Sequence, residues 1–355
     1  MSLLFSPLQI KDTTFKNRTV VSPMCMYSCV DGYANDFHLV HLGSRAVGGF
    51  GLIIQEATAV SPEGRISYGD MGLWNDEQIR KPKEIVDFVH AQHALIGIQL
   101  AHAGRKASHE LPKEGAKKIK PTDKNGWQTV SASALPFRDT EPAPLALDAS
   151  GIDKIKNDYK AATIRAKIAG YDIVEIHAAH GYLFHQFYSP LANKRTDKYG
   201  GSFENRIRLL LEVTEIVRNE WPEKKPLFVR ISATDWIEGG WNVDDSVKLA
   251  MALKKIGVDL IDVSSGGNVP KANIPSEPGY QAGFAAQIKK EANILTGAVG
   301  QITNAEQAEQ LLKKEKADLI LFGRESLRDP YLPLHAAQEL NVDVDWPLQY
   351  ERAKI

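Results

Sequence analysis

The sequence predicts an α/β fold in the form of a (β/α)8 TIM barrel, and three observations support this class. Short runs rich in Val, Ile and Leu recur eight times along the 355 residues, as expected for buried parallel strands. Amphipathic segments separate most of these runs, which favours right-handed crossover connections. Neither of the first two runs is followed by the Gly-x-Gly-x-x-Gly turn of an open dinucleotide-binding sheet. A closed barrel is therefore the preferred architecture.

The elements of this barrel can be placed in order along the chain. The expected strands are Thr19–Met24, Leu52–Ala57, Ile96–Leu100, Asp172–Ile176, Leu227–Ile231, Leu260–Val263, Ile294–Ala298 and Leu319–Phe322. Helices are expected at Asp153–Ala169, Phe203–Val217, Val247–Ile256 and Ala305–Leu312. In the first of these helices, Ile155, Tyr159 and Ala162 share one face, and we expect that face to pack on the barrel.

One connection is much longer than a crossover needs. The segment between the third and fourth strands, about residues 105–150, is polar and rich in Lys and Pro. Because long excursions are often lids or surface loops, we expect a loop or hairpin over one mouth of the barrel. No linker interrupts the chain, so we expect a single domain over residues 1–355 with a C-terminal tail at 341–355.

Composition narrows the class of protein. The formal net charge is -1 and no basic block is present, so nucleic-acid binding is not expected. No apolar stretch is long enough to span a bilayer, and the N-terminus does not resemble a secretory signal. The two cysteines, Cys25 and Cys29, cannot build a disulfide framework. We therefore expect a cytoplasmic protein.

The most informative cluster follows the fourth strand, where His177, His180 and Tyr182 occur within six residues. Chemistry in such barrels lies at the C-terminal ends of the strands. Three interpretations are open: two metal ligands, a structural pair bonded to backbone, or two neutral donors that polarise a carbonyl with the tyrosine as proton source. No third metal ligand is evident, so we expect no metal. Two imidazoles at one oxygen would act as an oxyanion hole.

Other strand ends carry further candidates. Gly300 follows the seventh strand, and Gly323 and Arg324 follow the eighth; glycines and an arginine at these two ends favour phosphate binding. Arg230 lies inside an apolar strand, where a cation needs a partner. That partner is either a carboxylate in the barrel or a ligand that becomes anionic, such as a reduced flavin. Gln99 suits a ring imide or is a satisfied core residue.

Together these residues resemble the old yellow enzyme family of flavin-dependent ene-reductases, and in particular its thermophilic-like subclass. The resemblance covers essentially the whole chain. It rests on Ser22-Pro-Met-Cys25-Met-Tyr27, Gln99-Leu-Ala-His-Ala-Gly-Arg105, His177-Ala-Ala-His180-Gly-Tyr182, the run Ser189–Gly201, Val229-Arg230-Ile-Ser, Gly323-Arg324 and Gln349-Tyr350-Glu351-Arg352.

The resemblance implies a barrel that binds FMN non-covalently, is reduced by NADPH or NADH, and reduces the C=C bond of α,β-unsaturated carbonyl compounds. His177 and His180 would hold the carbonyl oxygen, Tyr182 would donate the proton, and Tyr27 would shape the substrate pocket. The residues that would contact FMN are Ser22, Pro23, Met24, Cys25, Ala57, Gln99, Arg230, Gly300, Gly323 and Arg324.

The resemblance also predicts an oligomer. In the thermophilic-like subclass an arginine near the C-terminus enters the active site of a neighbouring subunit, and Arg352 matches it. We therefore expect a homodimer or homotetramer that shares Arg352 across the interface. The alternative is a solvated terminal charge. Rival functions are a metal-dependent lyase and a flavin-storing or redox-sensing protein. An iron–sulfur relative is disfavoured because two cysteines cannot hold a four-cysteine cluster.

Overall fold

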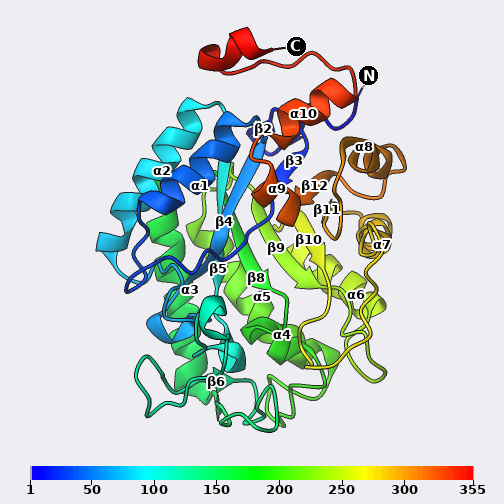
Figure 1. Cartoon of the computed structure of the whole chain (residues 1–355). Helices are drawn as coiled ribbons and strands as arrows, with labels where there is room; N and C mark the ends of the chain where they lie inside the picture. Colours follow the sequence, from blue (N-terminus) through cyan, green and yellow to red (C-terminus); the bar gives the residue numbers. More distant parts are fainter. Residues whose placement is uncertain (1, 355) are drawn as a thin grey trace.

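The computed structural model describes residues 2–354, and its centre is a closed barrel of parallel strands (Figure 1). The barrel strands are β3 (Thr19–Val21), β4 (Leu52–Ala59), β5 (Leu95–Ala101), β8 (Ile173–Ala178), β9 (Leu227–Ser232), β10 (Leu260–Ser264), β11 (Leu295–Ala298) and β12 (Leu319–Phe322). Each strand pairs with the next in this order, and β12 pairs with β3 to close the barrel. The predicted (β/α)8 architecture is confirmed.

Helices follow the strands and cover the outside of the barrel (Figure 1). They are α1 (Asp36–Val47), α2 (Arg80–Ala91), α3 (Ala149–Ala169), α4 (Leu183–Tyr188), α5 (Phe203–Glu220), α6 (Val243–Lys255), α7 (Ala282–Ala292), α8 (Ala305–Lys313), α9 (Arg324–Arg328) and α10 (Leu332–Glu339). Two helices, α3 and α6, begin earlier than the sequence predicts, and side-chain caps explain both starts. Asp148 accepts a hydrogen bond from the Gly151 N–H at 2.8 Å and begins α3, and Asn242 caps α6 in the same way.

The N-terminal end of the barrel is sealed by hydrocarbon. An antiparallel hairpin of β1 (Leu8–Ile10) and β2 (Thr13–Phe15), which the sequence reading did not identify, supplies Phe15. Its ring is fully buried and stacks on Phe228 with ring centroids 6.4 Å apart. Ile173, Leu260 and Leu319 belong to the same apolar cluster. This end therefore contributes to the packing of the core.

The long excursion lies at the opposite, C-terminal end. Its two short strands, β6 (Val130–Ser131) and β7 (Leu145–Ala146), pair in parallel, so the hairpin interpretation is wrong and the segment is a loop. It packs on α4, where Ser131 Oγ donates to Gln186 Oε1 at 2.9 Å. A tight hairpin turn would join antiparallel strands. Here the chain between β6 and β7 instead crosses back to the starting end of β6, so that the two strands run in the same direction. A lid role for this loop stays a prediction.

The C-terminal tail lies beside α10, at the N-terminal end of the barrel (Figure 1). It ends in a 3-10 turn, Leu348–Ala353, and a cleft of about 810 Å³ separates it from Lys16, Asn17 and His93. Among residues 2–354, no helix combines the length and the apolar character needed to cross a membrane.

Candidate active site

The predicted cluster converges at the C-terminal end of the barrel. The ring centroids of His177 and His180 lie 5.2 Å apart, and those of His177 and Tyr182 lie 5.0 Å apart. The planes are nearly perpendicular, at 87° and 85°. His177 is the last residue but one of β8, and Tyr182 precedes α4. Three side chains from one strand-to-helix turn therefore face one another, as the sequence predicts.

This turn has an unusual backbone that side chains hold in place. His180 and Gly181 both have positive φ, +58° and +73°. A Cβ at Gly181 would lie 2.2 Å from the Gly267 carbonyl oxygen, so only glycine fits there. Ser232 Oγ accepts from the His180 N–H at 2.9 Å, and Lys106 Nζ donates to the His180 carbonyl at 2.8 Å. The cluster is thus preorganised by groups on β9 and on the excursion.

Burial fixes the protonation state of the cluster. It lowers the pKa of His177 and of His180 well below the ordinary value, and the positive charges of Arg230 and Lys106 lower both further. Burial also raises the pKa of Tyr182 well above 10. At neutral pH two neutral imidazoles therefore face a protonated phenol. This set can donate hydrogen bonds and one proton.

A second polar group lies inside the barrel next to the histidines, since Arg230 on β9 pairs in register with His177 on β8. Arg230 Nε contacts Asp262 Oδ2 at 3.0 Å, and Gln99 Nε2 donates to Glu175 Oε1 at 2.7 Å. Burial and the negative charge of Asp262 raise the pKa of Glu175 to about 8. The carboxylate partner considered for Arg230 is therefore present. All four side chains are buried, so their arrangement is set by packing as well as charge.

The segment after β3 contributes the predicted residues Ser22, Pro23, Met24, Cys25 and Tyr27. The strand ends at Val21, earlier than expected, and no regular structure follows up to Cys29. The Met26 N–H donates to Glu56 Oε2 at 3.0 Å and ties the segment to β4, next to Ala57. Burial, followed by the charges of Asp70 and Glu56, raises the pKa of Cys25 well above its ordinary value. Its thiol is therefore protonated at neutral pH.

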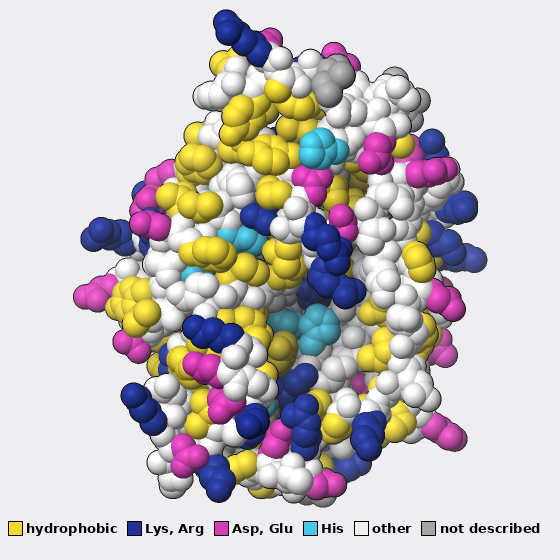
Figure 2. Space-filling model, viewed as in Figure 1, with side chains coloured by type: hydrophobic (Ala, Val, Ile, Leu, Met, Phe, Trp, Pro, Cys, Tyr) yellow, Lys and Arg dark blue, Asp and Glu magenta, His cyan; other side chains and the backbone are white. Residues whose placement is uncertain are grey.

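The predicted phosphate residues lie after β11 and β12. Gly300 has φ +118°, and a Cβ there would meet Gln281 Nε2 at 2.7 Å. A Cβ on Gly323 would meet nothing within 4 Å, so there is open space above it. Arg324 is exposed at the start of α9. Figure 2 shows histidine side chains in a hollow of this face with Lys and Arg around it, a setting that attracts anions.

Arg352 does not join this cluster within one chain. Its neighbours Glu351 and Lys354 line the cleft at the opposite end of the barrel, and the arginine itself is exposed. The predicted role of Arg352 concerns the active site of a neighbouring subunit, and it stays a prediction.

Sequence reasoning missed several partners of the site. They are the half-buried Lys106 and the buried Glu175, His185, Asp235 and Asp262. Glu175 and Asp262 each interrupt an apolar strand, the same signal that marked Arg230. The same reasoning could therefore have identified Glu175 and Asp262 from the sequence. The contacts of Lys106 depend on how the excursion folds, and no local pattern marks them. Within residues 2–354, no group of three or more His, Cys, Asp or Glu side chains is arranged to hold a metal.

Comparison with known proteins identifies the family. The model of the NADH:flavin oxidoreductase / NADH oxidase family matches residues 3–343. The chain belongs to this family. A curated relative, the NADPH dehydrogenase of Listeria monocytogenes serotype 4a (strain HCC23), is 50% identical over 355 residues, which is 99% of each chain. The chain is thus a flavin-dependent NAD(P)H oxidoreductase, with FMN as its cofactor.

Solved structures agree with this family. Morphinone reductase in complex with tetrahydroNAD has a TM-score of 0.79 and 30% identity, over 97% of this chain and 92% of that one. The old yellow enzyme homologue from Zymomonas mobilis has a TM-score of 0.78 and 28% identity, over 99% and 98%. 2-Naphthoyl-CoA reductase has a TM-score of 0.86 and 26% identity, but the chain spans only 52% of its length. The resemblance to old yellow enzymes is confirmed.

The residues present fit FMN. Arg230 is a buried cation whose Nε contacts the Asp262 carboxylate. Its positive charge suits a flavin ring nitrogen that gains negative charge. Gln99 is a buried amide, able to donate and to accept. The open space above Gly323 beside the exposed Arg324 suits a phosphate group. The flavin ring and its phosphate therefore each have chemically matched residues.

Proposed function

We propose that this oxidoreductase reduces the C=C bond of α,β-unsaturated carbonyl compounds. The observation that carries the proposal is the convergence of two neutral imidazoles and one protonated phenol, described above. Neutral donors at a carbonyl oxygen stabilise an enolate as it forms, without first attracting an anion. A phenol beside them can supply the proton that completes the reduction.

Each side chain has a separate task. The Ala179 N–H donates to His177 Nδ1 at 3.2 Å, so the proton of His177 is on Nε2, free to donate. His180 Nε2 lies 2.7 Å from Ser264 Oγ. When that hydroxyl donates to His180 in place of its longer, 3.4 Å contact with Gln281 Oε1, the proton of His180 is on Nδ1. Both rings then offer one N–H to the substrate oxygen. Tyr182 protonates the α-carbon.

Hydride transfer from the nicotinamide to the β-carbon is the chemistry that bound FMN would supply, with the coenzyme oxidised and the alkene reduced. The chain would hold FMN through the ten residues that the family resemblance implies, from Ser22 to Arg324. Arg230 supports the proposal for the ring because it is a buried cation. Gly300, Gly323 and Arg324 would hold the phosphate, and Tyr27 would border the substrate. Either NADPH or NADH would serve as reductant.

We further propose a homodimer or homotetramer of the thermophilic-like subclass, located in the cytoplasm. Arg352 would reach the active site of the neighbouring subunit. The support is its exposure on a tail that only partly covers its own barrel.

The proposal is tested by two half-reactions. Purified protein should be yellow, bleach with NADPH under anaerobic conditions, and regain its colour when an enone such as cyclohexenone is added. His177→Ala and His180→Ala should each weaken binding of a phenol that mimics the enolate. Colour without recovery by any enone would overturn the proposal and favour a flavin-storing protein.

A further inference from the structure

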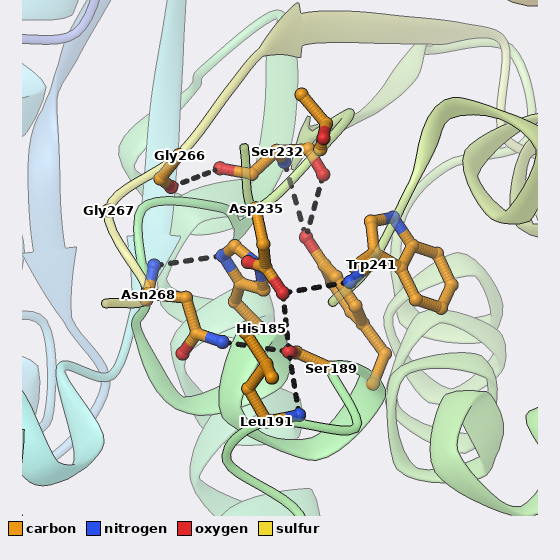
Figure 3. A network of polar contacts seen from close by, with 12 residues as sticks. His185, Ser189, Leu191, Ser232, Asp235, Trp241, Gly266, Gly267 and Asn268 are labelled. Atoms are coloured by element: carbon orange, nitrogen blue, oxygen red, sulfur yellow. Dashed lines mark hydrogen bonds and ion pairs between the residues drawn. The ribbon is translucent and has the colours of Figure 1, made fainter. Parts of the chain in front are cut away.

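A fully buried histidine–carboxylate pair, His185 and Asp235, belongs to a network of polar contacts (Figure 3) that reaches the active-site turn at Gly181. His185 is on α4 and Asp235 follows β9, and both side chains are 0% exposed. His185 Nε2 lies 2.8 Å from Asp235 Oδ1. Burying an imidazole and a carboxylate together is costly unless each makes specific contacts. Nothing in the proposed reaction requires either group to touch substrate, so the pair needs another explanation.

The contacts define where the proton of His185 is. The Gly181 N–H donates to His185 Nδ1 at 2.9 Å. Nδ1 is therefore an acceptor and carries no proton, and the proton of the neutral ring is on Nε2, facing Asp235. A ring with the opposite tautomer would point an N–H at the Gly181 N–H. The tautomer and the Gly181 contact thus depend on each other.

Gly181 is the centre of the turn that carries the active-site side chains. It separates His180 from Tyr182, and both His180 and Gly181 have positive φ. Its N–H is fixed by His185, and its carbonyl accepts from Gln186 Nε2 at 2.7 Å. A left-handed residue other than glycine is rare and persists only when its surroundings hold it. The His185 contact is one of the few that do so here.

The carboxylate is held from the other side. Asp235 Oδ2 accepts from Ser189 Oγ at 2.6 Å and from the Trp241 N–H at 2.9 Å. Burial alone would raise the pKa of Asp235, but His185, Ser189 and Trp241 together hold it below its ordinary value. Asn268 Nδ2 donates to Ser189 Oγ at 2.8 Å, which extends the network to the loop after β10. Asp235 therefore stays ionised and keeps Oδ1 toward His185.

We propose that His185 and Asp235 are positioning residues: Asp235 fixes the Nε2–H tautomer of His185, and His185 in turn holds the Gly181 N–H so that His180 and Tyr182 face the substrate. The inference rests on the proposed function, because it assigns these residues to the same turn. A carboxylate that sets the tautomer of a histidine is a known device in enzymes. Here the histidine acts on the backbone of the turn and not on the substrate.

The chain contains a matched control. His90 Nε2 lies 2.8 Å from Asp172 Oδ2, the same separation as in the buried pair. His90 is on α2, 39% exposed, and its partner precedes β8 at the opposite end of the barrel. Removing this pair tests whether loss of any His–Asp contact produces the effect.

The first experiment separates the Gly181 contact from simple packing. His185→Phe keeps a ring but removes both nitrogens, whereas His185→Asn keeps an acceptor, Oδ1, in the place of Nδ1. In the FMN-loaded enzyme, His185→Phe should raise the Kd of p-chlorophenol, read from the flavin absorbance, about tenfold. His185→Asn should recover most of that loss, and His90→Phe should change nothing. Equal losses in His185→Phe and His185→Asn, or no loss in either, would overturn the proposal.

The second experiment changes the tautomer of His185 while the size and shape of both side chains are kept. In Asp235→Asn the amide oxygen is forced to the Oδ2 position, because the Trp241 N–H donates there. The NH2 group then faces His185 Nε2 and drives the proton to Nδ1, against Gly181. Asp235→Asn should therefore weaken phenol binding about as much as His185→Phe. In a protein that already carries His185→Asn, the Asp235→Asn substitution should weaken phenol binding little further, because residue 185 no longer has an imidazole tautomer to change.

A third measurement does not depend on catalysis. NMR spectra of wild-type protein and of His185→Asn, both with ¹⁵N-labelled histidine, identify the His185 signals as those that only the wild type has. These signals should show a neutral ring with the proton on Nε2. A proton on Nδ1, or on both nitrogens, would overturn the proposal. If wild-type protein binds neither phenol nor enone while these signals are as expected, the proposed function fails and the His185 contact stands.

Discussion

The two ends of the barrel are built from the same strands but have opposite chemistry. At the N-terminal end Phe15 stacks on Phe228 among aliphatic side chains. At the C-terminal end the interior holds Arg230 and Asp262 in contact, with the histidine cluster beside them. The apolar end contributes stability through burial. The polar end costs stability and provides reactive groups, which is the division expected of this fold.

Single strands show the change from one end to the other. Residues two apart on a strand face the same side, so β8 presents Ile173, then Glu175, then His177 along its inner face. On β9, Phe228 is followed by Arg230 in the same way. The chemistry therefore changes from hydrocarbon to charge within about 7 Å of strand, given the usual rise per residue. An alternation of period two encodes both the core and the site.

The largest effect is expected from the polar end. Tyr182→Phe removes only the hydroxyl, which is the proposed proton donor, and should slow enone reduction by reduced enzyme at least about 100-fold. Flavin reduction by NADPH needs no proton from this group and should change little. Stopped-flow measurement of each half-reaction checks this. An equal slowing of both would mean that the phenol orients ligands and does not donate the proton.

The next effect contrasts the two ends directly. Phe228→Ala should lower the free energy of unfolding by about 3–5 kcal/mol by leaving a cavity, yet leave the Kd for phenol unchanged. Arg230→Met should be destabilising too, because it leaves the buried Asp262 carboxylate without its cation, and it should also lower FMN affinity. Urea unfolding and flavin titration measure the two quantities. Loss of FMN affinity in Phe228→Ala would contradict the separation of roles.

Much of the fold was predictable because its signal is local. Eight apolar runs marked the strands, and the strand ends gave the candidate residues without any knowledge of the structure. The β1–β2 hairpin was missed because strands of three residues are too short to show periodicity. The parallel pairing in the excursion was missed because it joins residues far apart in a segment without apolar pattern.

The sequence identified the side chains that lie together at the candidate site, but not the groups that support them. His177, His180 and Tyr182 stand out because polar residues follow an apolar strand. His185 looks like an ordinary residue of a short helix, and its role depends on a carboxylate 50 positions away along the chain. Contacts between strand ends arise only when the barrel closes. No single-sequence pattern encodes them.

A smaller effect concerns pH and the carboxyl group inside the barrel. The pKa of Glu175 is raised to about 8 from 4.5, so the native state binds its proton more tightly than the unfolded chain does. Stability from this group is full below about pH 4.5 and is lost as pH rises toward 8. Glu175→Gln removes this dependence and should gain stability relative to wild type between pH 5 and pH 8, at equal FMN loading. Parallel stability curves for the two proteins would refute it.

The smallest effect is expected from the tail, which lies at the apolar end of its own chain but would serve the polar end of another. Arg352→Ala should raise the KM for an enone several-fold through loss of one charged contact at an exposed position, with the rate of flavin reduction unchanged. Lys354→Ala, at an exposed position just after the same turn, is the control. Removal of residues 350–355 should also lower the oligomeric mass measured by light scattering. Unchanged mass and unchanged KM would show that Arg352 is a solvated terminal charge and that each barrel works alone.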